Sequence, residues 1–60
     1  MICKQTIFRD GDAEAFIEGN EYNVLRTYGQ GVNVTYILID ESGEENHVPQ
    51  AVIDEYFQEA

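Results

Sequence analysis

Residues 32–43 of this 60-residue chain read VNVTYILIDESG, and this stretch decides the fold. Valine, tyrosine and leucine occupy alternate positions in its first part, which places them on one face of a β-strand. Ile37 and Ile39 make the opposite face apolar as well, so we expect a central strand that is partly covered on both sides. The residues after Ile39 then predict a turn, with Gly43 at positive φ, and a short strand returns over residues 44–48.

Two further strands are predicted on the N-terminal side of this hairpin. Residues 2–8 mix β-branched and aromatic residues with polar ones, and residues 21–28 lead into a Gly-Gln-Gly turn. Residues 12–19 are ambiguous. They fit a short helix capped by Asp12 and stopped by Gly19, and they fit an irregular excursion that ends in a turn at residues 19–20.

The C-terminal segment begins at Pro49, whose fixed φ and missing N–H suit the first position of a helix. The apolar residues of this segment form one helical stripe, which favours a helix over a single turn followed by a short strand. The side chains that we expect in the core are Phe8, Phe16, Tyr22, Val24, Val34, Tyr36, Leu38, Val48, Val52 and Phe57.

Two motifs carry a resemblance to a known group of proteins. GNEYNV at residues 19–24 fits a GxxYxV strand, YILIDESG at residues 36–43 fits a YxxxDxxG hairpin, and Tyr56-Phe57 supplies a terminal aromatic pair. The chain in this respect resembles small Src-homology-3-like (SH3-like) proteins of bacteriophages and prophages. The resemblance implies a mainly β fold: a small SH3-like barrel of four to five antiparallel strands with a short C-terminal helix or helical turn, forming one domain over residues 1–60.

The resemblance says little about activity, because a fold does not fix a function. Proline-motif binding is disfavoured, since the chain has no tryptophan and lacks the ALYDY stretch of the peptide-binding SH3 domains.

Composition limits the classes of function. Apolar residues make up 43% of the chain, enough for a folded domain. Twelve acidic residues against three basic ones give a formal charge of −9, so nucleic acid and anionic membranes are poor partners. The longest apolar run, residues 36–39, is far shorter than a membrane span, and no signal peptide is recognisable. We therefore expect a cytoplasmic protein, in the host cell if a phage encodes it.

Nucleophilic catalysis would have to use Cys3 with His47, the only cysteine and the only histidine. A reactive thiolate needs nearby positive charge, and this chain supplies mostly negative charge. We expect Cys3 to be a small apolar filler and His47 a solvated surface residue. The sequence therefore predicts neither an enzyme nor a bound cofactor.

Five residues match the spacing of a calcium-binding EF-hand loop: Asp10, Asp12, Glu14, Ile17 and Glu21. Ala15 stands where the sharp turn of that loop needs glycine, and the flanking segments predict strands in place of helices. A calcium-dependent fold is thus a weak alternative, and we expect no metal site.

The acidic charge is the remaining signal. Residues 27–60 hold seven acids and no Lys or Arg, which concentrates the charge in the second half of the chain. We predict a non-catalytic interaction module, a phage or prophage accessory protein that binds the basic surface of a host protein. The predicted contact residues are Glu41, Glu44, Glu45, Asp54 and Glu55. Simple solubility explains the same charge, and a DNA-mimic inhibitor of a DNA-binding host enzyme is a further alternative.

Overall fold

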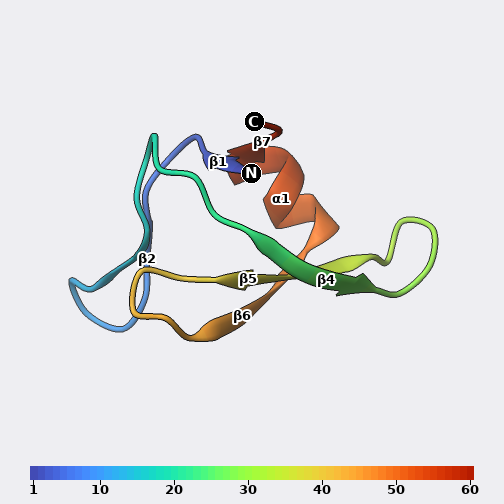
Figure 1. Ribbon diagram of the computed structural model, residues 1–60, viewed down its shortest axis with the longest axis horizontal. Helices are drawn as coiled ribbons and strands as arrows, with labels where there is room; N and C mark the ends of the chain where they lie inside the picture. The colour runs from blue at the N-terminus through green and yellow to red at the C-terminus, as the bar shows by residue number, and fades with distance from the viewer.

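The computed structural model describes all 60 residues and contains seven strands and one helix (Figure 1). The strands pair in three antiparallel sheets, with the orders β1-β7, β2-β3 and β4-β5-β6. This confirms a small, mainly β, barrel-like domain with a short C-terminal helix. The elements are β1 (Ile2–Cys3), β2 (Ile7–Phe8), β3 (Glu14–Phe16), β4 (Val24–Tyr28), β5 (Thr35–Ile39), β6 (Glu45–Pro49), α1 (Gln50–Tyr56) and β7 (Phe57–Gln58).

Strand β5 is the central strand of the largest sheet, as its two apolar faces predicted. Leu38 is fully buried in the main core, and Ile37 is only 1% exposed although it lies on the opposite face. On that second face, Tyr28 of β4 and His47 of β6 join by a 2.9 Å hydrogen bond between the phenol oxygen and Nδ1. Because these strands flank β5, the pair reaches across β5 on the face of the sheet that carries Ile37.

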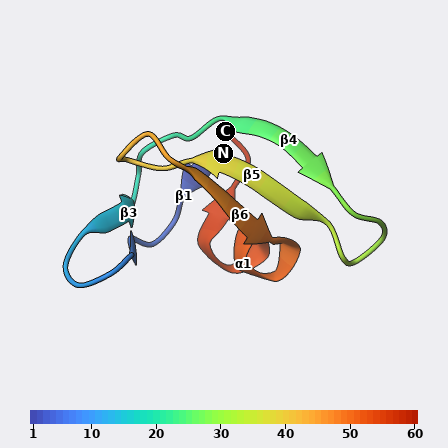
Figure 2. The same cartoon turned by 90° about the horizontal axis from the view of Figure 1, so that it is seen from below.

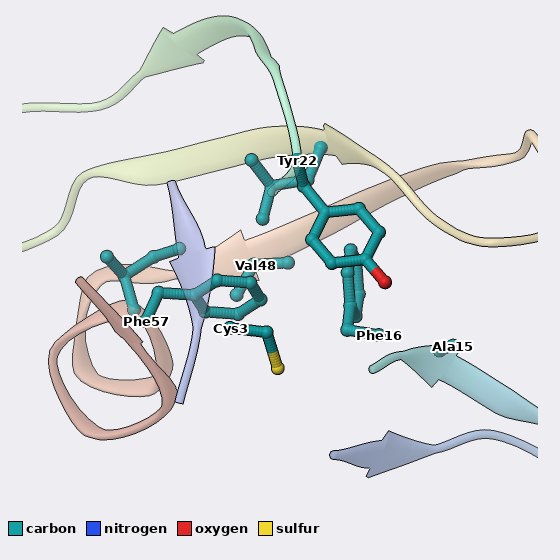
Figure 3. Close-up of a cluster of buried hydrophobic side chains, with 8 residues drawn as sticks. Cys3, Ala15, Phe16, Tyr22, Val48 and Phe57 are labelled. Carbon is teal, nitrogen blue, oxygen red and sulfur yellow. The ribbon is translucent and has the colours of Figure 1, made fainter. Parts of the chain in front are cut away.

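The main core lies between the three-stranded sheet and the N- and C-terminal segments (Figure 3). The ring of Phe16 packs edge-on against Tyr22 and Phe57, with centroid distances of 4.9 and 5.3 Å. Such pairs contribute roughly 0.5–1.5 kcal/mol each beyond the area that they bury. The core cluster consists of Cys3, Ala15, Phe16, Tyr22, Leu38, Val48, Ile53 and Phe57.

The core prediction was wrong at Phe8 and Val24, and Val34 is only half-buried and lies outside the core cluster. Neighbouring residues of a strand point to opposite faces, and in β2 it is Ile7 that packs against the core. Phe8 therefore points outward and is 59% exposed. Val24 is 37% exposed, at a register shift between Val24 and Arg26 where β4 begins. Cys3, Ala15, Ile37 and Ile53 are buried in addition to the predicted residues.

The N-terminal segment is not one strand. It bends at Lys4 and Gln5, so that β1 pairs with β7 while β2 pairs with β3. Residues 12–19 contain β3 and a turn at residues 18–19, with Gly19 at φ 88°, and no helix. Of the two alternatives, the irregular excursion that ends in a turn agrees better with the structure than the helix does, but β3 itself was not predicted.

The C-terminal segment combines the two predicted forms. Pro49 ends β6 and caps α1, with φ −64° and ψ 154°, so the helix proper starts one residue later than predicted. Helix α1 packs against β5 and β6 (Figure 2), and β7 then places Phe57 in the core. Seven residues make up α1, and no helix in the protein has the length and hydrophobicity needed to cross a bilayer.

The loop between β4 and β5 extends away from the body of the protein (Figures 1 and 2). Gly29 opens this loop at φ 101°, and a Cβ atom there would overlap the backbone carbonyl of Asn33. Only glycine fits this position without a shift of the loop.

Candidate functional site

The turn between β5 and β6 is organised by the carboxylate of Asp40, which is 5% exposed. Its Oδ1 accepts hydrogen bonds from the Ser42 hydroxyl at 2.6 Å and from the backbone N–H groups of Ser42 and Glu44 at 2.9 and 3.0 Å. Its Oδ2 accepts one from Asn46 Nδ2 at 2.6 Å. Burial by itself would raise the pKa of Asp40, but these hydrogen bonds outweigh it and lower the pKa to about 2.

Arg9 joins the segment after β2 to this turn. Its Nη1 lies 3.5 Å from Asp40 Oδ2 and donates to the Ser42 hydroxyl at 2.8 Å, while its Nη2 contacts Glu44 Oε2 at 3.0 Å. Glu44, a predicted partner-binding residue, therefore already has a positive partner within the chain. The Arg9–Glu44 pair is solvent-exposed, so water and salt weaken it.

Glu41 is also engaged within the chain. Its carboxylate accepts hydrogen bonds from the hydroxyl of Tyr22 and from Asn20 Nδ2, and its backbone N–H donates to the carbonyl of Ala15 at 2.9 Å. The Tyr22 hydroxyl in turn accepts the backbone N–H of Ile17 at 2.8 Å. Burial and the neighbouring carboxylate raise the pKa of Tyr22. Glu41 thus fixes a buried tyrosine as well as presenting charge at the surface.

The other three predicted contact residues are exposed and have no cationic side chain paired with them. Glu45 begins β6 and makes no side-chain hydrogen bond in the chain. Asp54 accepts a hydrogen bond from Gln50 Nε2 at 2.8 Å on the surface of α1. Glu55 follows Asp54, and its carboxylate raises the pKa of Tyr56.

The five predicted residues lie on two different parts of the fold. Glu41 and Glu44 lie in the turn that precedes β6 and Glu45 is its first residue, whereas Asp54 and Glu55 lie on the helix that follows it (Figure 1). We call the first three the turn acids and the last two the helix acids. Most of β6 and the first turn of α1 lie between the two groups along the chain, and α1 packs back against β5 and β6.

Cys3 and His47 are not brought together. Cys3 is buried in the main core, its Sγ lies 3.0 Å from the carbonyl oxygen of Gln5, and burial raises the pKa of the thiol. His47 is exposed on the other face of the sheet, where it pairs with Tyr28. The thiol is thus held in its protonated, weakly nucleophilic form.

The residues with EF-hand-like spacing also lie apart. Glu14 lies in β3, Glu21 forms an isolated bridge with Ile2, and Asp10 and Asp12 flank the turn between β2 and β3. No three His, Cys, Asp or Glu side chains are placed to hold a metal ion, and the surface has no pocket.

Sequence reasoning missed the part played by Asp40 and Arg9. Asp40 was recognised as a turn residue, and the short polar residues that follow it, Ser42 and Asn46, were the available signal for a hydrogen-bonded carboxylate. Arg9 gave no such signal, because it lies 31 positions away along the chain. No family model, curated protein or solved structure matches this chain significantly.

Proposed function

We propose that this protein is a non-catalytic acidic interaction module that binds a basic surface of another protein. The observation that carries the proposal is that the carboxylates of Glu45, Asp54 and Glu55 are exposed and form no ion pair within the chain, since Lys4 reaches only the backbone carbonyl of Asp54. Carboxylates in this state attract a basic protein and raise its rate of association. A phage or prophage accessory role with a host protein as partner is the setting that the sequence resemblance implies.

The separation of the two acidic groups defines the partner more closely. The turn acids lie at the start of β6 and in the turn before it, whereas the helix acids lie on α1, so a partner meets two groups of carboxylates on different elements. The partner should therefore carry two clusters of Lys or Arg, one for the turn acids and one for the helix acids. Glu44 joins such a contact only if the partner replaces Arg9 as its cation.

Salt-dependent capture tests this proposal. The immobilised protein is incubated with bacterial lysate and washed at low and at high salt, and retained proteins are identified by mass spectrometry. A basic protein held at low salt and released at high salt is the expected result, because salt screens exposed charge pairs. Retention of nothing at either salt concentration contradicts the proposal.

Charge-neutralising variants identify the surface. Glu45→Gln, Asp54→Asn and Glu55→Gln combined should weaken capture of the basic protein at least tenfold. Asp10→Asn, Asp12→Asn and Glu18→Gln combined remove the same charge from other exposed positions and serve as the matched control. Equal weakening by both triple variants would mean that overall charge, and not these residues, holds the partner. Competition by duplex DNA would favour the DNA-mimic alternative.

A further inference from the structure

The β4–β5 hairpin is free of acidic residues in a strongly acidic protein. Residues 22–39 contain no Asp or Glu, and Arg26 is their only charged side chain, while all twelve acids lie elsewhere. Most of the large apolar side chains that are exposed gather on the same hairpin: Val24, Leu25, Tyr28 and Val32, the last of them 87% exposed. Negative charge and exposed apolar surface are therefore segregated.

Strand β4 also has a free edge. It pairs only with β5, and every one of its residues is exposed. No backbone hydrogen bond outside the strand ladders involves residues 23–28. The other edge of this sheet, β6, is protected by the charge of Glu45 and by Pro49, which has no N–H to donate. The edge of β4 thus offers unpaired N–H and C=O groups beside apolar side chains.

We propose that a second copy of this chain pairs with this edge, strand β4 against β4 in antiparallel orientation, to give a continuous six-stranded sheet. The distribution of charge favours a second copy of the chain over a basic partner at this edge. A basic partner would be attracted to the acidic turn and helix and not to a hairpin whose only charge is Arg26. Two copies that meet at β4 bring together the longest stretch of each molecule that contains no acidic residue.

The sequence of β4 also selects a register. Arg26 pairs with Ile37 and Tyr28 with Thr35, so Arg26 and Tyr28 lie on the same face of the sheet. A register centred on Arg26 would oppose two guanidinium groups, which is unfavourable. A register centred on Thr27 places Arg26 opposite Tyr28 of the second copy, twice by symmetry, and a guanidinium beside an aromatic ring is attractive.

The β-bulge at the start of β4 limits the contact. The register shift between Val24 and Arg26 disturbs the strand there and β4 ends at Tyr28, so pairing is confined to residues 26–28. Such a short contact is far below the size of a stable protein interface, and we expect a weak dimer with a dissociation constant of roughly 1 mM. Two copies with a charge of −9 each repel one another, so high salt should strengthen the dimer.

Sedimentation equilibrium of the full chain tests the proposal. At about 1 mM protein in 1 M NaCl, where the screening length is about 3 Å, the average mass should clearly exceed the 6.8 kDa of one chain, and it should fall at low salt. Amide hydrogen exchange should slow with protein concentration at residues 26–28 and not at β6. A mass that stays at 6.8 kDa under the high-salt condition overturns the proposal, as does concentration-dependent protection at β6 alone.

A matched pair of variants completes the test. Thr27→Lys opposes two lysines in the Thr27-centred register and should weaken the dimer at least tenfold. Gln30→Lys adds the same charge to the exposed loop of the same hairpin and should leave the dimer within about twofold of wild type. Thr27 is exposed, and circular dichroism checks that both variants fold. Equal dimerisation of the two variants would overturn β4 pairing. Dimerisation does not depend on the proposed basic partner, so either proposal can fail alone.

Discussion

Nδ2 of Asn46 donates a 2.6 Å hydrogen bond to the buried Oδ2 of Asp40, which ties the second residue of β6 to the residue that follows β5. The other carboxylate oxygen of Asp40 meanwhile accepts three hydrogen bonds from the turn itself. One side chain therefore closes the hairpin from within. Because Arg9 also reaches this carboxylate, the same group helps to hold the β2–β3 hairpin against the β5–β6 turn.

Asp40→Asn should destabilise the protein by about 1–3 kcal/mol, because both carboxylate oxygens accept hydrogen bonds and an amide offers only one acceptor. In either orientation, the NH₂ group of asparagine faces donors, from Asn46 and Arg9 on one side or from Ser42 and Glu44 on the other. Urea unfolding measures the loss. Asp12→Asn, at an exposed position, is the control and should change stability by less than about 0.5 kcal/mol.

The same carboxylate gives a dependence of stability on pH. The pKa of Asp40 is lowered from 3.8 to about 2 in the folded chain, so its contribution is complete above pH 4 to 5 and is lost as pH falls towards 2. The difference in unfolding free energy between wild type and Asp40→Asn should shrink by about 2 kcal/mol between pH 5 and pH 2. A difference that is constant over this range would show that the native carboxyl is not held ionised.

Tyr22→Phe should cost about 1–2 kcal/mol, because the backbone N–H of Ile17 loses its acceptor and Glu41 loses a donor. Glu41→Gln keeps an acceptor beside Tyr22 and should cost less. Tyr36→Phe is the matched control, since the Tyr36 hydroxyl makes no hydrogen bond within the chain. Thermal or urea unfolding compares the three variants, and equal losses for Tyr22→Phe and Tyr36→Phe would contradict this account.

Gly29→Ala should be more destabilising than Gly31→Ala, although both glycines lie in one loop at positive φ. A Cβ at position 31 meets open space, so only the backbone strain of about 1–2 kcal/mol applies. A Cβ at position 29 additionally overlaps the carbonyl of Asn33, which should raise the total to roughly 3 kcal/mol or more. Chemical unfolding of the two variants measures the difference, and equal losses would mean that the loop shifts freely.

Prediction from sequence succeeded where the signal was local. The alternation in residues 32–39 predicted the central strand, although β5 begins only at Thr35 and Val32 lies exposed in the loop. The pattern Asp-Glu-Ser-Gly predicted the turn after it, with Gly43 observed at φ 88°. It failed where a choice between neighbours depended on distant partners. Either Ile7 or Phe8 could have pointed inward from β2, and only pairing with β3 in the observed register places Ile7 against the core.

The candidate site divides in the same way. The acidic residues and their concentration after residue 26 are properties of the sequence. Their separation into the turn acids and the helix acids depends on β6 running between them, and the pairing of Glu44 with Arg9 joins residues 35 positions apart. No local pattern contains that contact.

The sequence by itself therefore determined the mainly β class, the central strand, the turn after it and the strong negative charge, because periodicity, turn chemistry and charge act over a few residues. Only the tertiary structure decided which acidic side chains are hydrogen-bonded or ion-paired within the chain. It also placed Cys3 and His47 on different faces of the sheet and left β4 with an unpaired edge that carries no acidic residue. Those features depend on contacts between segments far apart along the chain, and long-range pairing is settled by the packing of the whole domain.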